Sequence, residues 1–232
     1  MCQQCEMKSP PFPTRRRLLG TLSAAVLLAA AGPAPQEVIS GDEALRRLQA
    51  GNARYVANKT HLRDFDAGRV ARVATHRPLA SILSCSDARV GPEFVFDQGP
   101  GDLFVVRVAG NILQDEGLAS LEYAEQFLGS PLVFVLGHSN CGAVEAAIKV
   151  VQDNATLPGH LPGLIDQVKP AVLAAQKTQP TDLLAAAIVE NVRQTMQNVV
   201  AAKPLLADMI AGGKVKVAGG VYNIATGKVT LV

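Results

Sequence analysis

Residues 132–142 read Leu-Val-Phe-Val-Leu-Gly-His-Ser-Asn-Cys-Gly, a run of large apolar side chains that ends abruptly in polar residues. Two other apolar runs have the same form: residues 79–83 end at Ser-Cys-Ser-Asp, and residues 103–108 end at Ala-Gly-Asn. Each run is nearly continuous in Val, Leu, Ile and Phe, which is typical of strands that are covered on both faces in a parallel sheet. The three runs therefore predict an α/β fold with a mostly parallel central sheet flanked by helices.

Helical patterns separate and flank these strands. Ser40-Gly-Asp-Glu43 has the spacing of a capping box and predicts a helix that continues to about residue 58. Further helices are expected where apolar residues recur at three and four positions: 118–128, 141–151 and 181–203. Segments without such a period are interpreted as connections, at 61–77 and 158–163. Short apolar runs close the chain as strands, at 214–224 and 228–232.

The first 35 residues differ in pattern from the rest. Arg15, Arg16 and Arg17 precede an apolar run of 14 residues, which ends in small residues that include Ala29 and Ala31. This order resembles a twin-arginine export signal, and the apolar run is shorter than the ~20 residues that span a bilayer. We therefore expect residues 1–35 to be an export signal and linker, without a permanent membrane span. Residues 36–232 are expected to form a single domain that acts in the periplasm or outside the cell.

Composition limits the partners of this domain. The leader holds four of the 22 basic residues and one of the 20 acidic residues, so the remaining chain carries 18 basic and 19 acidic side chains. It therefore lacks the basic excess that phosphate backbones require, and we do not expect it to bind nucleic acid. Cys2 and Cys5 form a Cys-x-x-Cys pair inside the leader and are assigned no role.

Residues that bind soft or borderline metals follow two of the predicted strands. Cys85, Asp87 and Arg89 come after the first run, and His138 and Cys141 come after the third. The carboxyl ends of parallel strands meet at one edge of a sheet, so the two groups can lie together despite their separation in sequence. Two thiolates and one imidazole suit Zn²⁺, and an open fourth position is typical of catalytic zinc. The alternative is two buried cysteines and an unrelated histidine in a core.

The helix expected at 141–151 favours a thiolate at Cys141. Cys141 stands where the helix 141–151 is expected to begin. Because the amino end of a helix carries a partial positive charge, it favours the deprotonated form of a nearby thiol.

Three motifs carry a family resemblance. Cys-Ser-Asp-Ala-Arg at 85–89, Phe-Val-Val-Arg-Val-Ala-Gly-Asn at 104–111 and Gly-His-Ser-Asn-Cys-Gly at 137–142 resemble the signatures of beta-class carbonic anhydrases. The similarity runs from about residue 40 to the C-terminus. It implies an enzyme that interconverts CO₂ and bicarbonate, with one Zn²⁺ held by Cys85, His138 and Cys141. It also implies association into homodimers or multiples of dimers.

The resemblance gives Asp87 two possible positions. Paired with Arg89, its carboxylate accepts a hydrogen bond from the nucleophile and leaves the metal open; in a closed state it becomes the fourth zinc ligand. The subtype that closes has a bicarbonate pocket made by a Trp–Arg–Tyr trio. Arg107 and Tyr222 match two members of that trio, but Ile82 stands at the Trp position. Bicarbonate regulation is therefore not implied.

Three further residues, Gln98, Asn111 and Gly137, are expected to line the substrate crevice, although turn formation and local polarity explain them as well. Two other functions fit the same residues. One is a hydrolase of CS₂ or COS on the same scaffold, and the other is a non-catalytic zinc-binding module. The open fourth position and the Asp87–Arg89 pair argue against the second alternative, because a structural zinc site needs neither.

Overall fold

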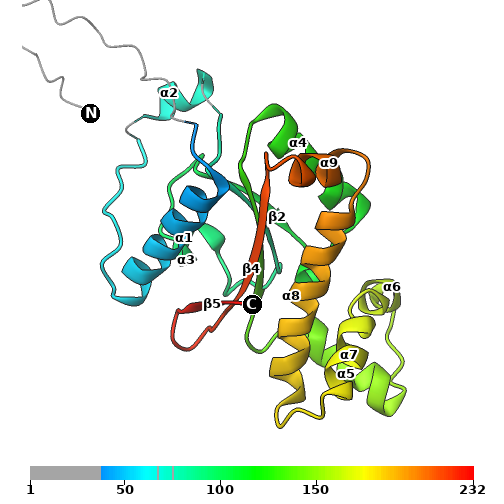
Figure 1. Cartoon of the computed structure of the whole chain (residues 1–232). Coiled ribbons are helices and arrows are strands. Elements are labelled where there is room, and N and C mark those ends of the chain that lie inside the picture. The colour runs from blue at the N-terminus through cyan, green and yellow to red at the C-terminus, as the bar shows by residue number, and fades with distance from the viewer. Residues whose placement is uncertain (1–37, 67, 75) are drawn as a thin grey trace, which may run out of the picture. The chain divides into compact units, whose positions relative to one another are not determined.

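The computed structural model describes residues 38–66, 68–74 and 76–232 (Figure 1). Across these residues, five strands form one sheet in the order β2-β1-β3-β4-β5. The strands are β1 (Ala80–Ser84), β2 (Leu103–Arg107), β3 (Leu132–His138), β4 (Lys216–Tyr222) and β5 (Val229–Leu231). The first four pair in parallel, and β5 pairs antiparallel with β4. The predicted α/β fold with a mostly parallel sheet is confirmed.

The register of the central strands brings the ends of β1 and β3 together. Ser84, the last residue of β1, pairs with Arg107 of β2 on one side and with Leu136 of β3 on the other. The chain leaves β1 and β3 at the same edge of the sheet. The two polar groups that follow these strands therefore start from adjacent points.

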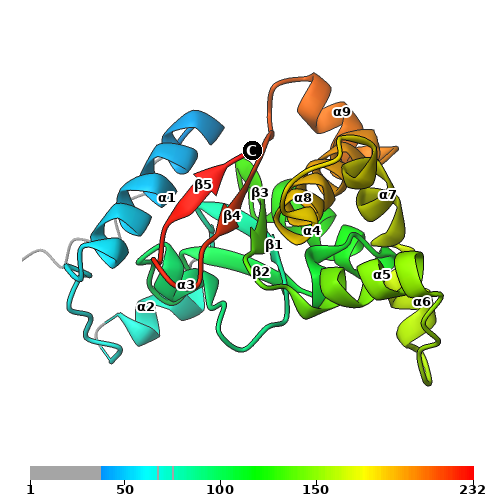
Figure 2. The ribbon, with the colours of Figure 1, turned by 90° about the horizontal axis from the view of Figure 1, so that it is seen from below.

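Helices cover both faces of the sheet, as Figure 2 shows. One face carries α1 (Gly41–Val56) and α3 (Pro92–Val95), and the other carries α4 (Asp115–Phe127), α8 (Leu183–Ala201) and α9 (Leu205–Ala211). The remaining helices are α2 (Arg69–Ala74), α5 (Gly142–Asp153), α6 (Leu161–Asp166) and α7 (Lys169–Lys177). Of these, α5 and α7 pack against each other and against α8.

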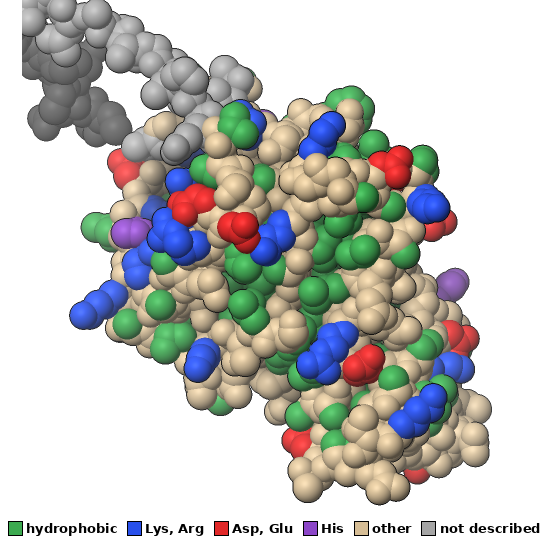
Figure 3. Space-filling view, in the orientation of Figure 1, with side chains coloured by type: hydrophobic (Ala, Val, Ile, Leu, Met, Phe, Trp, Pro, Cys, Tyr) green, Lys and Arg blue, Asp and Glu red, His purple; other side chains and the backbone are tan. Residues whose placement is uncertain are grey.

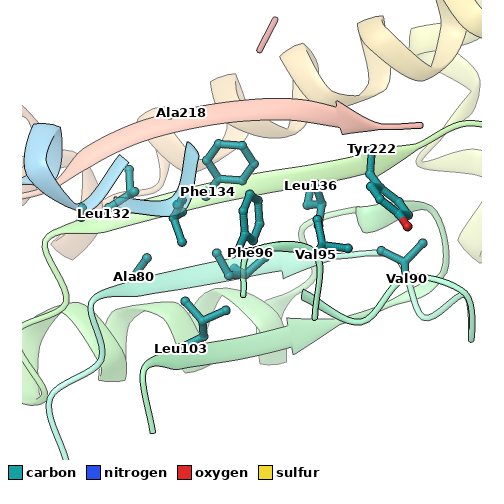
Figure 4. Close-up of a cluster of buried hydrophobic side chains, with 13 residues drawn as sticks. Ala80, Val90, Val95, Phe96, Leu103, Leu132, Phe134, Leu136, Ala218 and Tyr222 are labelled. Carbon is teal, nitrogen blue, oxygen red and sulfur yellow. The ribbon is translucent and has the colours of Figure 1, made fainter. Parts of the chain in front are cut away.

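The core between α1 and the sheet is built from large apolar side chains (Figure 4). The rings of Phe96 and Phe134 meet edge to face with centroids 5.3 Å apart, and Leu48 of α1 is fully buried against the same cluster. Burial of each such side chain contributes about 1.5–3 kcal/mol to folding. These contacts hold β1 and β3 in place, and the two polar groups follow the ends of these strands.

The opposite face is packed closely enough to require glycine. A β-carbon on Gly219 of β4 would lie 2.5 Å from the sulfur of Met196, and one on Gly137 of β3 would lie 2.5 Å from Val192 Cγ2. Helix α8 therefore rests almost directly on the backbone of β3 and β4.

The amino end of α1 follows the prediction in part. Ser40 is the N-cap, and its side chain accepts a hydrogen bond from the N–H of Glu43 at 3.2 Å. The carboxylate of Glu43 instead binds Arg46 and Arg47, so the reciprocal bond of a capping box is replaced by ion pairs along the helix.

Several short helices differ from the prediction. The segment 61–77 contains α2, and the predicted connection 158–163 is wrong at its end because Pro162 and Gly163 lie inside α6. Proline is tolerated in the first turn of a helix, where its missing N–H has no intrahelical partner. Helices α7 and α9 were not predicted, since each is short and gains its stability from packing.

The predicted leader, with Cys2 and Cys5, lies outside the described residues. Among the helices that are described, none is both long and apolar enough to cross a membrane. On the face seen in Figure 3, basic and acidic side chains lie interspersed, and apolar side chains gather in the band between α1 and α8.

Candidate metal centre

Three ligand atoms from three positions converge at the carboxyl end of the sheet. Cys85 follows β1, His138 is the last residue of β3, and Cys141 is the N-cap of α5. Their sulfur and nitrogen atoms all lie within 4.8 Å of one another, and all three residues are buried. Neither cysteine is in a disulfide. The two predicted polar groups therefore do form one cluster.

The histidine ring is oriented for a metal. His138 Nδ1 lies 2.9 Å from the carbonyl oxygen of Ser139, so Nδ1 carries the proton and donates it to that oxygen. The other ring nitrogen, Nε2, is buried and has no hydrogen-bond partner among the described residues. A buried lone pair without a donor, next to two sulfurs, fits a borderline cation such as Zn²⁺.

The two thiols differ in their protonation when no cation balances them. The neighbouring Cys141 thiol, the His138 ring and the N–H of Gly110 lower the pKa of Cys85 to about 4, against the opposing effect of burial. The neighbouring Cys85 thiolate and burial raise the pKa of Cys141. Burial lowers the pKa of His138, but the Cys85 thiolate, the carbonyl oxygen of Ser139 and the Asp87 carboxylate together outweigh burial, and the net shift is upward. A divalent cation would stabilise both thiolates and the neutral imidazole together.

The helix that starts at Cys141 acts in the predicted direction. The N–H groups of Ala143 and Val144, in the first turn of α5, both lower the pKa of the Cys141 thiol. They oppose the larger upward effects of Cys85 and burial, so the helix end assists metal binding without being sufficient by itself to ionise the sulfur.

Asp87 and Arg89 form a two-pronged ion pair beside the cluster. Arg89 Nε donates to Asp87 Oδ1 at 2.9 Å and Nη2 donates to Oδ2 at 2.7 Å, while the N–H of Arg89 also bonds Oδ1. Asp87 Oδ2 lies 3.9 Å from His138 Nε2. The Arg89 bonds hold the pKa of the Asp87 carboxyl well below its usual range. This is the paired position of Asp87; its predicted role as a fourth ligand in a closed state stays a prediction.

Residues 80–229 match the family described as carbonic anhydrase. Carbonic anhydrase 2 of Mycobacterium tuberculosis is 34% identical over 189 residues, which cover 81% of this chain and 91% of that protein. The beta-carbonic anhydrase CcaA superposes with a TM-score of 0.64 at 26% identity, over 82% of this chain and 87% of that one. The chain belongs to the beta-class carbonic anhydrases.

A second solved family member gives the same result. The Coccomyxa beta-carbonic anhydrase, solved in complex with acetazolamide, superposes with a TM-score of 0.63 at 29% identity, over 72% of this chain and 78% of that one. The family match over residues 80–229 contains strands β1 to β4 and the three motifs of this beta-class carbonic anhydrase.

Arg107, which matches the arginine of the bicarbonate trio, bonds two backbone carbonyl groups of the loop after β1. Its Nε donates to the carbonyl oxygen of Cys85 at 3.0 Å, and its Nη2 donates to the carbonyl oxygen of Asp87 at 2.7 Å. Tyr222 places its hydroxyl 3.2 Å from the hydroxyl of Tyr55. In this family member Arg107 therefore braces the loop that carries a predicted ligand and the carboxylate.

The three predicted crevice residues occupy different places. Asn111 is buried in η1 (Ala109–Asn111), and its Nδ2 has no partner among the described residues. Gly137 adjoins Asn111, but its lack of a side chain is explained by the contact with Val192 of α8. Gln98 donates to the carbonyl oxygen of Phe96 and lines a separate hollow. No described contact joins Gln98 to the metal cluster, and its role in the crevice stays a prediction.

Sequence reasoning missed the backbone groups that hold the ligands. Gly110 donates its N–H to Cys85 Sγ at 3.3 Å, and the carbonyl oxygen of Ser139 fixes the ring of His138. Gly110 has a φ of +76°, which an Ala-Gly-Asn turn after a strand suggests. Nothing in the sequence indicates which atom that turn would contact.

Proposed function

We propose that this chain is a zinc-dependent carbonate dehydratase, a lyase that catalyses the reversible hydration of CO₂ to bicarbonate and a proton. The observation that carries the proposal is the convergence of Cys85, His138 and Cys141 beside the Asp87–Arg89 ion pair. A structural zinc site has four protein ligands, whereas this cluster offers three and places a charged carboxylate at the remaining side.

The reaction needs a nucleophilic oxygen and a sink for one proton. Zinc, when bound by the two sulfurs and the imidazole, supplies a Lewis acid that makes water nucleophilic near neutral pH. One C–O bond forms at the carbon of CO₂, the product is bicarbonate, and one proton passes to buffer.

The side chains of the chain itself orient this step. The carboxylate of Asp87 stays ionised because Arg89 lowers its pKa, so it acts as a hydrogen-bond acceptor for the attacking water. Its side chain is 18% exposed, and that of Arg89 is 55% exposed, which leaves this side of the cluster open to solvent. The bidentate pairing keeps the carboxylate directed toward Arg89 and near His138 Nε2.

The proposal is tested by stopped-flow CO₂ hydration with zinc analysis of the same sample. We expect activity that is lost on removal of the metal by a chelator and restored by one equivalent of Zn²⁺. A zinc-loaded chain that does not hydrate CO₂ would contradict the proposal. Sulfide release from COS, measured in parallel, decides between CO₂ and a sulfur analogue, and a faster reaction with COS would favour the alternative substrate.

We propose further that residues 1–35 direct export of the folded chain. Cys85 and Cys141 lie close enough to be at risk of oxidation to a disulfide if they entered an oxidising compartment unfolded and without metal. Twin-arginine export moves folded proteins and would allow zinc loading first. Replacing Arg15, Arg16 and Arg17 by Lys keeps the charge, and cell fractionation should then find the chain retained inside. Unchanged export of that variant would contradict the proposal.

We also propose that the chain forms homodimers or multiples of dimers. Large apolar side chains are exposed on its described surface, among them Leu62, Phe65, Phe94 and Phe127. Light scattering coupled to size-exclusion chromatography should give at least twice the mass of the mature chain. A monomer at micromolar concentration would contradict this proposal.

A further inference from the structure

Asn191 is a buried polar residue that connects a distant helix to the metal cluster. It lies in α8, is 2% exposed, and donates from Nδ2 to the carbonyl oxygen of Gly110 at 2.7 Å. The same glycine donates its N–H to Cys85 Sγ at 3.3 Å. A single residue of backbone therefore lies between the Asn191 amide and the sulfur of a predicted zinc ligand.

The turn that contains Gly110 has two consecutive residues in the left-handed region of the backbone. Gly110 has φ +76° and ψ 13°, and Asn111, which carries a side chain, has a φ of +45°. Consecutive left-handed residues persist only where surrounding contacts hold them. Within the turn, the N–H of Asn111 bonds the carbonyl oxygen of Val108 at 3.0 Å. The Asn191 amide adds a bond from a separate element of the fold.

The turn is also packed against the helix that begins at Cys141. A β-carbon on Gly110 would lie 3.2 Å from the β-carbon of Ala143 in α5 and 3.3 Å from Val168 Cγ2. The turn therefore has little room to move toward α5. A displacement of its backbone would change the position of the N–H group that faces Cys85.

We propose that Asn191 is a positioning residue of the metal centre. By holding the carbonyl oxygen of Gly110, it keeps the N–H of that glycine directed at Cys85 Sγ, which orients the sulfur for zinc. The inference rests on the proposed zinc site. Hydrogen-bond partners behind metal ligands typically contribute about 10–100-fold to metal affinity.

The test compares two conservative changes in α8. Asn191→Leu removes the amide donor at similar volume. Thr195→Val is the matched control, because Thr195 lies one turn further along α8 and is 3% exposed. Zinc affinity is measured by competition with a chromophoric chelator, and the cobalt-substituted proteins are compared by their sulfur-to-metal charge-transfer bands. We expect Asn191→Leu to weaken zinc binding by about 10–100-fold and to shift those bands, with Thr195→Val like the wild type.

Two results would overturn the proposal. One is wild-type zinc affinity and an unchanged cobalt spectrum in folded Asn191→Leu; the other is equal weakening by Thr195→Val, which would indicate a general loosening of α8. Circular dichroism of the metal-free proteins reports folding, and the isosteric Asn191→Asp serves if the leucine variant does not fold. Because these measurements need no turnover, a wild-type chain that binds zinc but does not hydrate CO₂ would refute the proposed function alone.

Discussion

Two buried polar clusters lie at opposite ends of β1 and differ in what satisfies them. Beyond the last residue of β1, Cys85 joins His138 and Cys141 in the metal cluster. Near its start, the Ser81 hydroxyl lies within hydrogen-bond distance of two groups, the carboxyl group of Glu125 in α4 and the hydroxyl of Ser130, each 3.2 Å away. The side chains of both clusters are buried, yet the first cluster is suited to a divalent cation and the second to a proton.

The difference between the clusters follows from the groups that surround the Glu125 carboxyl in one and the two cysteine thiols in the other. Burial raises the pKa of Glu125 to about 8, and the hydroxyls of Ser81 and Ser130 only partly oppose the shift. No charged side chain among the described residues contributes to that shift, so Glu125 is a neutral acid at pH 7. In the metal cluster, N–H donors from Gly110 and from the first turn of α5 face the sulfurs. Burial alone therefore does not decide charge; the donors around the group do.

The largest expected effect is at the metal cluster. Cys141→Ser replaces a thiolate by a hydroxyl that is a poor ligand for zinc. The purified variant should lose bound zinc, and CO₂ hydration should fall by on the order of 10³-fold or more, measured by stopped flow with metal analysis. Ser130→Ala, in the other cluster, is the control and should keep both zinc and activity. Full zinc occupancy and activity in Cys141→Ser would remove the distinction between the clusters.

A smaller loss is expected beside the cluster. Arg89→Ala frees the Asp87 carboxylate without touching a ligand, so the variant should retain zinc while kcat/KM for CO₂ falls by about 10²-fold. Arg193→Ala removes an exposed guanidinium from α8 and serves as control. Near-normal CO₂ hydration by Arg89→Ala with full zinc content would refute the pairing role of Arg89.

The cluster of Ser81, Glu125 and Ser130 should make the free energy of unfolding depend on pH. Because the pKa of Glu125 rises from 4.5 to about 8 on folding, the folded state keeps a proton that the unfolded state releases in this window. The free energy of unfolding should therefore decrease as pH rises from about 5 to 8, by on the order of 1 kcal/mol per pH unit from this group. Glu125→Gln cannot titrate and should lack that decrease, which urea unfolding at several pH values measures.

The exposed Glu116 of α4 provides the matched control, as Glu116→Gln removes an acidic group without burying an amide. It should keep the wild-type slope. Zinc content and CO₂ hydration should be unchanged in Glu125→Gln. A wild-type slope in Glu125→Gln would mean that another group controls the alkaline loss of stability.

The smallest effect is expected at the hydroxyls around Glu125. Ser130→Ala removes the hydroxyl that bonds Ser81 and the carbonyl oxygen of Leu132, and should lower the free energy of unfolding by about 1 kcal/mol for each bond lost. Since the Ser130 hydroxyl lowers the pKa of Glu125, its loss should extend the alkaline decrease in stability to higher pH. Unfolding curves at pH 6 and pH 9 separate the two effects, and a shift of the slope toward lower pH would contradict the account of Glu125.

The pattern of apolar runs predicted the parallel strands and the edge of the sheet at which the candidate ligands meet. Strands buried on both faces read as continuous apolar runs, and the residue types at the ends of β1 and β3 made Cys85, His138 and Cys141 candidate ligands, which the structure brings together. The short helices α6, α7 and α9 were not predictable in the same way, because their stability depends on packing against other elements.

Sequence by itself determined which side chains could bind a metal and at which edge of the sheet they would meet. Tertiary structure decided how these side chains are held, because Arg107 bonds the carbonyl groups of the loop after β1 and Asn191 bonds the turn at Gly110. Tertiary structure also decided that Glu125 keeps its proton. The physical reason is the separation in sequence over which each kind of interaction acts. Strand and helix periods are local and repeat along the chain, whereas a hydrogen bond between residues 81 positions apart depends on how α8 packs on the sheet, and burial of a carboxyl depends on everything around it.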